Sequence, residues 1–542
     1  MCIILSFVTT KYFNMRLFIF LVILIAFQLN AQTDLTPYQN IDVQHYKLEL
    51  SLNNFNDQIE GTATVTIQFV NNTDKFVLDL VAKDGATTTK GMTVRSVETN
   101  GENLKFSHVG ELLSIFDKVE KGTKKDYTIR YLGIPKDGLI ISENKFGERT
   151  FFGDNWPTRA HNWFPCVDHP SDKATVEFLV TAPDEYQVVA TGVLLEESKV
   201  DDGTFYHWKT DVILPTKVMV IGAAEFAVQH CGHVHNVPIS SWVYPDNKEE
   251  GFHDYVQAKE VLAYYIEKMG GYPYEKLANV QSKTKFGGME NASNIFYFEN
   301  SVTGDRKHED LIAHEIVHQW FGNSASEKDW PHLWLSEGFA TYLTDLYILD
   351  THGNETFKKR MAAERNQVTK FALRSKNPVV DYKTTNLLHL LNPNSYQKGG
   401  WILHMIRDKV GNEAFWQAIN DYYQAYEFSN ANTADFKTIL EKSTQMDFEA
   451  FFKQWLHTPG HPILNQNWEQ KKEELSLVIN QVQDGATFRF PLTIEIQFKD
   501  GTNQNERLEI SEKQSSFTFK TDKKVTAIQL DPEVQLLFEE KE

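Results

Sequence analysis

The stretch HEIVHQWFGNSASEKDWPHLWLSE, residues 314–337, decides how the middle of this chain folds. Its two histidines, His314 and His318, stand four residues apart in an amphipathic helical pattern. Four residues make about one helical turn, so both imidazoles lie on one face and can reach a single Zn²⁺. Two helix histidines with ordinary hydrogen bonds are the alternative for these residues alone, because chance gives such a match in roughly a few per cent of chains this long.

Glu337 is the candidate for a third ligand. It opens a second helical pattern, after a connection rich in Trp and Pro, and lies 19 positions beyond His318. Two imidazoles and one carboxylate leave a coordination position open for water, which is the arrangement of catalytic rather than structural zinc. Glu315, beside the first histidine, could then accept a proton from that water as it attacks a carbonyl. Taken by itself, Glu337 could equally be a solvated first-turn carboxylate favoured by the helix dipole.

Composition limits the class of protein. The chain has 542 residues, 41% of them hydrophobic, so two to four domains with real cores are expected. Its 54 basic and 73 acidic residues give a formal charge of −19, and no basic run could track a phosphate backbone. Nucleic acid is therefore excluded as an expected partner.

The N-terminus predicts export. Met15-Arg16 precedes the apolar run LFIFLVILIAF, and Ala31 provides a small residue before Gln32. These features are typical of a secretory signal peptide over residues 1–31, with Met15 as an alternative start. We expect cleavage and a periplasmic, cell-surface or extracellular protein with no stable membrane span, the alternative being a retained anchor.

The remaining chain divides into three parts. Residues 32–235 alternate with period two and predict a β-sheet domain, whereas residues 236–460 have mainly helical spacing. Alternation returns in residues 461–542, which predict a small β-sandwich. Only two cysteines, Cys166 and Cys231, follow the signal sequence, and they could form one bridge or remain two thiols.

Several motifs together resemble one family. GGMEN (287–291), HEIVHQWFGN, WLSEGFATY and SYQKGG (395–400) are similar in order and spacing to the zinc aminopeptidases of the aminopeptidase N and leukotriene hydrolase family, a gluzincin metallopeptidase family. NWFPCVDHPSDKATVEFLV resembles that family's first domain. The resemblance implies a multidomain α+β protein, with an N-terminal β-sheet-rich domain, a thermolysin-like, mainly helical catalytic domain and a small C-terminal β-sandwich.

The resemblance also implies roles for individual residues. His314, His318 and Glu337 match the ligands of one Zn²⁺ per chain, and Glu315 matches the general base. Tyr396 matches the tyrosine that donates to the oxyanion, a task suited to a phenol that is neutral near pH 7. A helix-start aromatic residue packed on the core is the alternative for Tyr396.

Gly287, Gly288, Met289, Glu290 and Asn291 match the segment that binds substrate in the family. The glycines would let a peptide pair along this edge as an added strand, and Glu290 matches the residue that binds the free amine. The resemblance thus implies peptide substrates with a free N-terminus, whereas the alternative is a turn with a solvent-facing glutamate.

Two departures from the family bear on function. Where many members carry a second amine-binding glutamine or glutamate, this chain has Trp156, whose indole cannot accept a hydrogen bond but could attract an ammonium by cation–π contact. Asp154 or Asn155 could substitute. The large C-terminal helical domain of many relatives has no counterpart before Glu542, so we expect a more open cleft.

Three functions follow as hypotheses. The first is a secreted zinc aminopeptidase, in which the Glu290 carboxylate counts residues from the peptide's amine. The second is an endopeptidase of the same zinc class, and the third is a non-catalytic peptide-binding protein that kept the fold. No motif specifies an oligomeric state.

Overall fold

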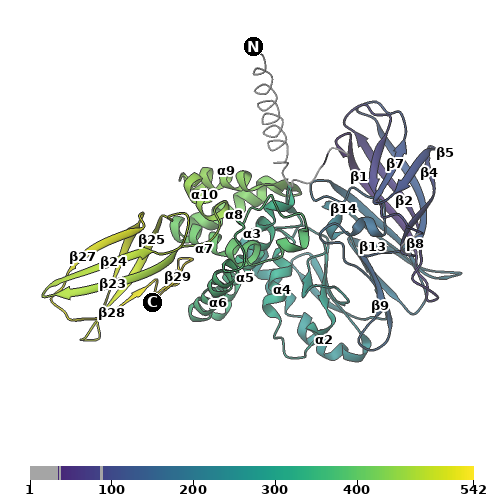
Figure 1. Ribbon diagram of the computed structural model, residues 1–542. Coiled ribbons are helices and arrows are strands. Elements are labelled where there is room, and N and C mark those ends of the chain that lie inside the picture. Colours follow the sequence, from purple (N-terminus) through teal and green to yellow (C-terminus); the bar gives the residue numbers. More distant parts are fainter. Residues whose placement is uncertain (1–34, 36–37, 86–88, 542) are drawn as a thin grey trace, which may run out of the picture.

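The computed structural model describes residues 35, 38–85 and 89–541, and the expected signal sequence at 1–31 lies outside these residues. Three regions follow one another along the chain, an N-terminal β region, a helical middle region and a C-terminal β region (Figure 1). This confirms the predicted three-part α+β architecture. No helix among the described residues is both long and apolar enough to cross a membrane.

The N-terminal region is built on an eight-stranded sheet of mostly antiparallel strands. Its central strands alternate between buried and partly exposed side chains, as the period-two sequence predicts. The sheet has the order β13 (Val193–Val200), β14 (Gly203–Pro215), β11 (Lys173–Ala182), β1 (Ile41–Ser51), β2 (Ile59–Phe69), β8 (Lys124–Ile134), β4 (Gly91–Thr99) and β5 (Glu102–Asn103). Two smaller sheets complete the region, β12 (Gln187–Ala190), β15 (Ile221–Ala224), β10 (Arg149–Gly153) and β9 (Leu139–Glu143), and β3 (Phe76–Asp79), β7 (Leu112–Phe116) and β6 (Lys105–Val109).

The middle region contains a five-stranded sheet that the helical spacing did not reveal. Its order is β16 (Ala227–Val234), β17 (Val237–Val243), β18 (Leu277–Ser282), β20 (Asn294–Phe298) and β19 (Gly288–Met289). Strand β18 is buried at every residue, so its sequence shows no alternation to read. The boundary expected at residue 235 falls in the turn between β16 and β17, which pair with each other, so this sheet begins at Ala227.

Nine α-helices of the described chain surround this sheet or extend from it. They are α2 (Lys248–Tyr255), α3 (Ala258–Met269), α4 (Glu309–Val317), α5 (Trp334–His352), α6 (Asn354–Ala372), α7 (Gly399–Val410), α8 (Asn412–Tyr426), α9 (Thr433–Thr444) and α10 (Glu449–Leu456). A short parallel pair joins β21 (Ala325–Glu327) to β22 (Ser429–Ala431). Helix α5 is buried along 15 of its 19 residues and forms the centre of the helical layer. The surrounding packing therefore fixes the position of Glu337 in its first turn.

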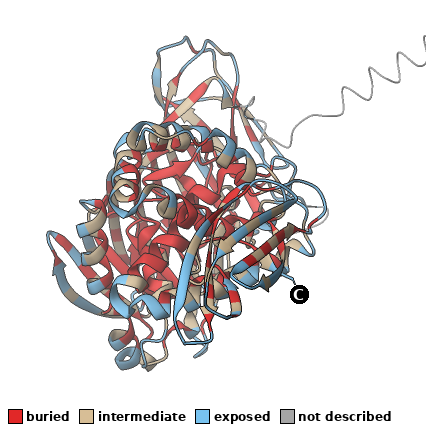
Figure 2. Cartoon of the chain, turned by 90° about the vertical axis from the view of Figure 1, so that its left-hand side faces the viewer, coloured by how far each residue is buried: buried red, intermediate tan, exposed pale blue. Residues whose placement is uncertain are grey.

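The C-terminal region has two sheets. One contains β27 (Gln514–Lys520), β24 (Glu474–Gln481), β23 (Ile463–Lys471) and β29 (Glu539–Glu540), and the other contains β26 (Asn503–Ile510), β25 (Phe490–Phe498) and β28 (Val525–Leu530). Their strands are antiparallel except for β29, which pairs parallel with β23. Their buried residues, such as Leu477 and Ile494, belong to one hydrophobic core with most of those of the middle region. The N-terminal region forms a second core, to which middle-region residues such as Val280 and Phe296 also belong. Figure 2 shows buried residues in the interior and exposed ones along the outer strands and loops.

The two cysteines of the described chain are not bridged. Cys166 is buried in the N-terminal region, and Cys231 is a partly exposed residue of β16. Of the two alternatives that the sequence left open, the structure therefore has two free thiols.

Candidate active site

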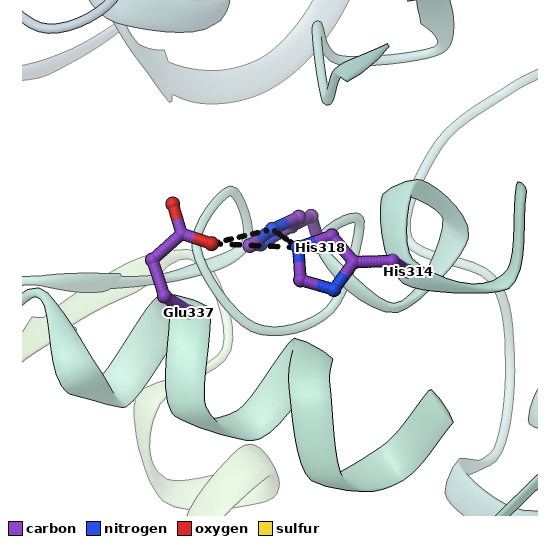
Figure 3. A group of neighbouring side chains, drawn as sticks. All are labelled: His314, His318 and Glu337. Atoms are coloured by element: carbon purple, nitrogen blue, oxygen red, sulfur yellow. Dashed lines mark hydrogen bonds and ion pairs between the residues drawn. The ribbon is translucent and has the colours of Figure 1, made fainter. Parts of the chain in front are cut away.

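Helix α4 carries His314, and His318 follows its last residue in the same helical conformation, so the two histidines lie side by side. The acidic first turn of α4 favours the helix start, and the buried Ile312 and Ile316 attach it to the core. The imidazoles therefore project from the remaining face, with Nε2 of His314 3.1 Å from Nε2 of His318. Figure 3 shows both rings turned towards Glu337.

Glu337 reaches these rings from the first turn of α5. Its Oε2 atom lies 3.4 Å from Nε2 of His314 and 3.3 Å from Nε2 of His318, and it makes no hydrogen bond although it is buried. In a tetrahedron with zinc–ligand bonds of about 2.0–2.1 Å, neighbouring donor atoms lie about 3.3 Å apart. The three side chains therefore fit one Zn²⁺, and the buried oxygen without a hydrogen bond is the atom that such an ion would satisfy.

A hydrogen bond on the side of the ring opposite Glu337 fixes the orientation of the His318 imidazole. Its Nδ1 atom donates to the carbonyl oxygen of Phe321 at 3.0 Å, which leaves Nε2 as the atom that faces Glu337. Burial lowers the pKa of His318, but the carboxylates of Glu337, Glu290 and Glu315 outweigh it and raise the pKa to about 10. Three carboxyl groups and two imidazoles thus lie together in this buried site, and both kinds of group are ligands that a divalent cation such as Zn²⁺ binds.

Glu315 lies one residue beyond His314 on the inner face of α4. It is 5% exposed, and burial raises the pKa of its carboxyl group well above the usual range. A Cβ atom built on Gly288 would come within 2.2 Å of its Oε1 atom. The absence of a side chain at position 288 is therefore what leaves room for the Glu315 carboxylate.

Glu290 follows the edge strand β19, which pairs antiparallel with β20. Its carbonyl oxygen accepts hydrogen bonds from Nε2 of Gln319 at 2.9 Å and from Nδ2 of Asn323 at 2.7 Å, so residues just beyond α4 fix this segment. The carboxyl group is buried, which raises its pKa, and its Oε1 atom has no hydrogen-bond partner. Glu290, Glu315 and His318 form a second group that could hold a cation, with donor atoms within 4.8 Å of one another.

Tyr396 completes the site from a π-helical turn, Asn394–Lys398, that leads into α7. Such turns are frequent at functional sites because they displace one side chain from the regular helical face. The phenol ring stacks on the imidazole of His314, with ring centroids 6.0 Å apart and planes 11° apart. Burial, followed by the charge of Glu337, raises the pKa of Tyr396 well above its usual value, so the hydroxyl group stays a neutral donor.

Of the three residues that the sequence suggested as partners of Glu290 in binding the amine, only Trp156 lies in the cavity. Asp154 accepts from Nη2 of Arg159 at 2.7 Å, and the amide of Asn155 donates to two main-chain carbonyls, so both are engaged away from the cavity. Trp156 does line the cavity; it packs edge-on against Phe286, and its buried Nε1 atom has no hydrogen-bond partner. Neither substitute that the sequence suggested therefore assists Glu290.

One cavity of about 380 Å³ joins these side chains. Of the five residues of the GGMEN segment, four line it, and Asn291 is buried outside this lining. The other residues that line the cavity were not predicted from the sequence; they are Phe286, Asp310, Leu311, Thr341, Arg360, Glu364, Leu391 and Gln397. Asp310 could have been found, since it precedes His314 by one helical turn, but nothing in the sequence points to the α6 residues.

Comparison with known proteins agrees with this site. Residues 254–455 match the Peptidase family M1 domain, and residues 42–218 match the Peptidase M1 N-terminal domain. The chain is 29% identical to glutamyl aminopeptidase of Homo sapiens over 334 residues, which are 58% of this chain and 34% of that protein. It is 24% identical over 492 residues to probable aminopeptidase 1 of Sulfurisphaera tokodaii, covering 85% of this chain and 59% of the relative.

The chain thus spans from about a third to three fifths of the length of these relatives. The two domain matches follow one another in the order of the N-terminal and middle regions and together cover most of the chain. This chain belongs to peptidase family M1.

Proposed function

We propose that this protein is an exported zinc aminopeptidase that releases residues from the N-termini of peptides. The observation that carries the proposal is the convergence of a zinc-ligand triad, Glu315 and Glu290 in one cavity. Export rests on the apolar sequence before Gln32, and N-terminal sequencing of the mature protein tests it.

Each side chain has a task in this reaction. A Zn²⁺ ion held by His314, His318 and Glu337 would supply a Lewis acid for the scissile carbonyl and lower the pKa of the attacking water. Glu315 accepts a proton from that water and later returns it to the leaving amine. Tyr396 donates a hydrogen bond to the oxyanion of the tetrahedral intermediate, a bond that strengthens as negative charge develops.

Glu290 confers the preference for a free N-terminus. Its buried Oε1 atom lacks a donor, and an ammonium group at the end of a peptide paired along β19 would provide one. Because Asp154 and Asn155 are engaged elsewhere, we propose that Glu290 is the only carboxylate of the described residues that binds the amine.

The proposed function is tested with aminoacyl anilides whose amine is free or acetylated, with and without chelator. We expect hydrolysis of the free substrates alone, and loss of hydrolysis on chelation. In Glu290→Gln we expect kcat/KM for the free substrate to fall about 10- to 100-fold with metal content unchanged, because a charge-assisted hydrogen bond is lost. Equal cleavage of acetylated substrates would instead identify an endopeptidase, and bound zinc without any hydrolysis would identify a non-catalytic binding protein.

A second prediction concerns Gly288. We expect Gly288→Ala to lower kcat about 100-fold or more, because the new Cβ atom would displace the Glu315 carboxylate by van der Waals overlap, and an error of about 1 Å in a catalytic group can cost that much. Gly271→Ala is the matched control, since a Cβ atom at position 271 would meet nothing within 4 Å and the residue lies outside the cavity. Steady-state kinetics on one anilide compare the two, and equal activities would contradict the steric role of Gly288.

A further inference from the structure

One wall of the cavity carries charged groups that the proposed reaction does not use. Asp310 of α4 and Arg360 and Glu364 of α6 line this wall, and Asp345 of α5 lies behind it. We propose that Glu364 and Asp310 form a subsite that selects a lysine or arginine side chain at the substrate residue following the scissile bond. The inference rests on the proposed aminopeptidase function, whose substrate class it narrows.

The charges of this wall do not balance. The Arg360 guanidinium donates through Nε to Asp345 and through Nη1 to Asp310 at 3.0 Å, and its Nε lies 3.7 Å from Oε1 of Glu364. One cation therefore faces three carboxyl groups. Burial raises the pKa of Glu364 well above its usual range, and the neighbouring charge of Asp345 raises it further. This is expected where one guanidinium group is shared among several carboxyl groups.

The decisive observation is a buried carboxyl group that lines the cavity without a cation of its own. Glu364 is only 5% exposed, its Oε2 atom accepts no hydrogen bond from an N–H group, and its carboxyl group shares a proton with that of Asp345. An ammonium or guanidinium group entering from the cavity would replace that proton and let the carboxyl group ionise, which recovers the free energy lost by burying it without a cation. Asp310 is half exposed at the rim and adds a second carboxylate on the path of an entering cation.

The wall lies on the leaving-group side of the metal ligands. Glu290 lies beside His318, whereas His314 and Asp310 follow at steps of four residues towards the start of α4. Eight residues of helix rise about 12 Å, so Asp310 is about that far along the axis from His318. An extended peptide spans about 7 Å in two residues, so a long side chain on the second residue can span the remaining distance to Asp310.

A side-chain cation suits this wall better than a metal ion. The two groups of the described residues that could hold a metal both lie at the catalytic centre, and Arg360 already occupies the middle of the wall. An ammonium or guanidinium group brings several N–H donors, and its long apolar stem can pack on Leu311.

The test uses the zinc-loaded full chain and three substrates with amidated C-termini, Ala-Lys-NH2, Ala-Met-NH2 and Ala-Glu-NH2. We expect the wild-type kcat/KM for the lysine substrate to exceed that for the methionine substrate about tenfold, since one well-placed charge pair has about this effect, and the glutamate substrate to be the poorest. Glu364→Gln and Asp310→Asn should each lower the lysine-to-methionine ratio severalfold. Glu355→Gln, the same charge change at an exposed site of α6, should leave the ratio unchanged.

Each outcome decides the proposal. A wild-type ratio near one, or a high ratio unchanged in both subsite variants, would overturn it, provided that alanine anilide is hydrolysed. No alanine release from any substrate, including the anilide, would overturn the proposed function and the subsite with it. If Glu364→Gln does not fold, as judged by circular dichroism, the ratio in Asp310→Asn decides, because the Asp310 side chain is 47% exposed and its replacement perturbs no core.

Discussion

Glu315→Gln should keep its zinc and its fold but lose about 10²- to 10⁴-fold in kcat, the usual contribution of a general base. Glutamine has the same shape and fits the space beside Gly288, where the Glu315 carboxylate is confined. Its amide cannot accept a proton from water, so the attack on the carbonyl loses its base while the donors to the oxyanion remain. Initial rates on a saturating aminoacyl anilide, with metal content measured on the same sample, provide the measurement.

Zinc content and melting temperature of the Glu315→Gln variant provide the control. If Glu315→Gln binds one zinc ion per chain and melts at the wild-type temperature, the lost activity belongs to proton transfer alone. An unchanged kcat would remove Glu315 from the mechanism, and a loss of zinc together with activity would make Glu315 a ligand instead of a base.

The parts of this site that the sequence predicts are those whose geometry is local. His314 and His318 share a face because a helix repeats every 3.6 residues, and this holds whatever surrounds the helix. Predicting Glu337 as a ligand required a further, long-range assumption, namely that the start of α5 faces α4. Only the resemblance of the motifs to the family supported that assumption. In the structure the Oε2 atom of Glu337 lies within 3.4 Å of the Nε2 atoms of both histidines.

The parts that the sequence could not predict depend on contacts between distant elements. Strand β18 is buried on both faces, so its residues carry no alternation that would distinguish a strand from a buried helix segment. The wall at Arg360 and Glu364 arises only where α4, α5 and α6 meet, and each of its acids alone is typical of a solvated helix surface. Asp154 looked available in the sequence because its partner Arg159 is recognised only once the chain is folded.

Removal of Glu337 should abolish both metal binding and hydrolysis. We expect Glu337→Ala to lose zinc at concentrations that saturate the wild type, because the remaining imidazoles supply two donors where a catalytic zinc site uses three. A ligand at 100 times its dissociation constant stabilises the folded state by about 2.7 kcal/mol, which for a region of roughly 200 residues corresponds to about 5–10 °C in Tm. Zinc should therefore raise the Tm of the wild type but not that of Glu337→Ala, with equilibrium dialysis giving the affinities directly.

The comparison with Glu315→Gln decides between two ligand sets that share His318. In the first set the ion lies among His314, His318 and Glu337, and in the second among Glu290, Glu315 and His318. The first predicts that Glu337→Ala loses zinc and Glu315→Gln retains it, whereas the second predicts the reverse. We expect the first, because its donor atoms are already 3.1–3.4 Å apart and the imidazole of His318 is oriented by Phe321 towards Glu337. Retention of zinc by Glu337→Ala would move the ion to the Glu290 side of the cavity and leave the substrate amine without its binding group.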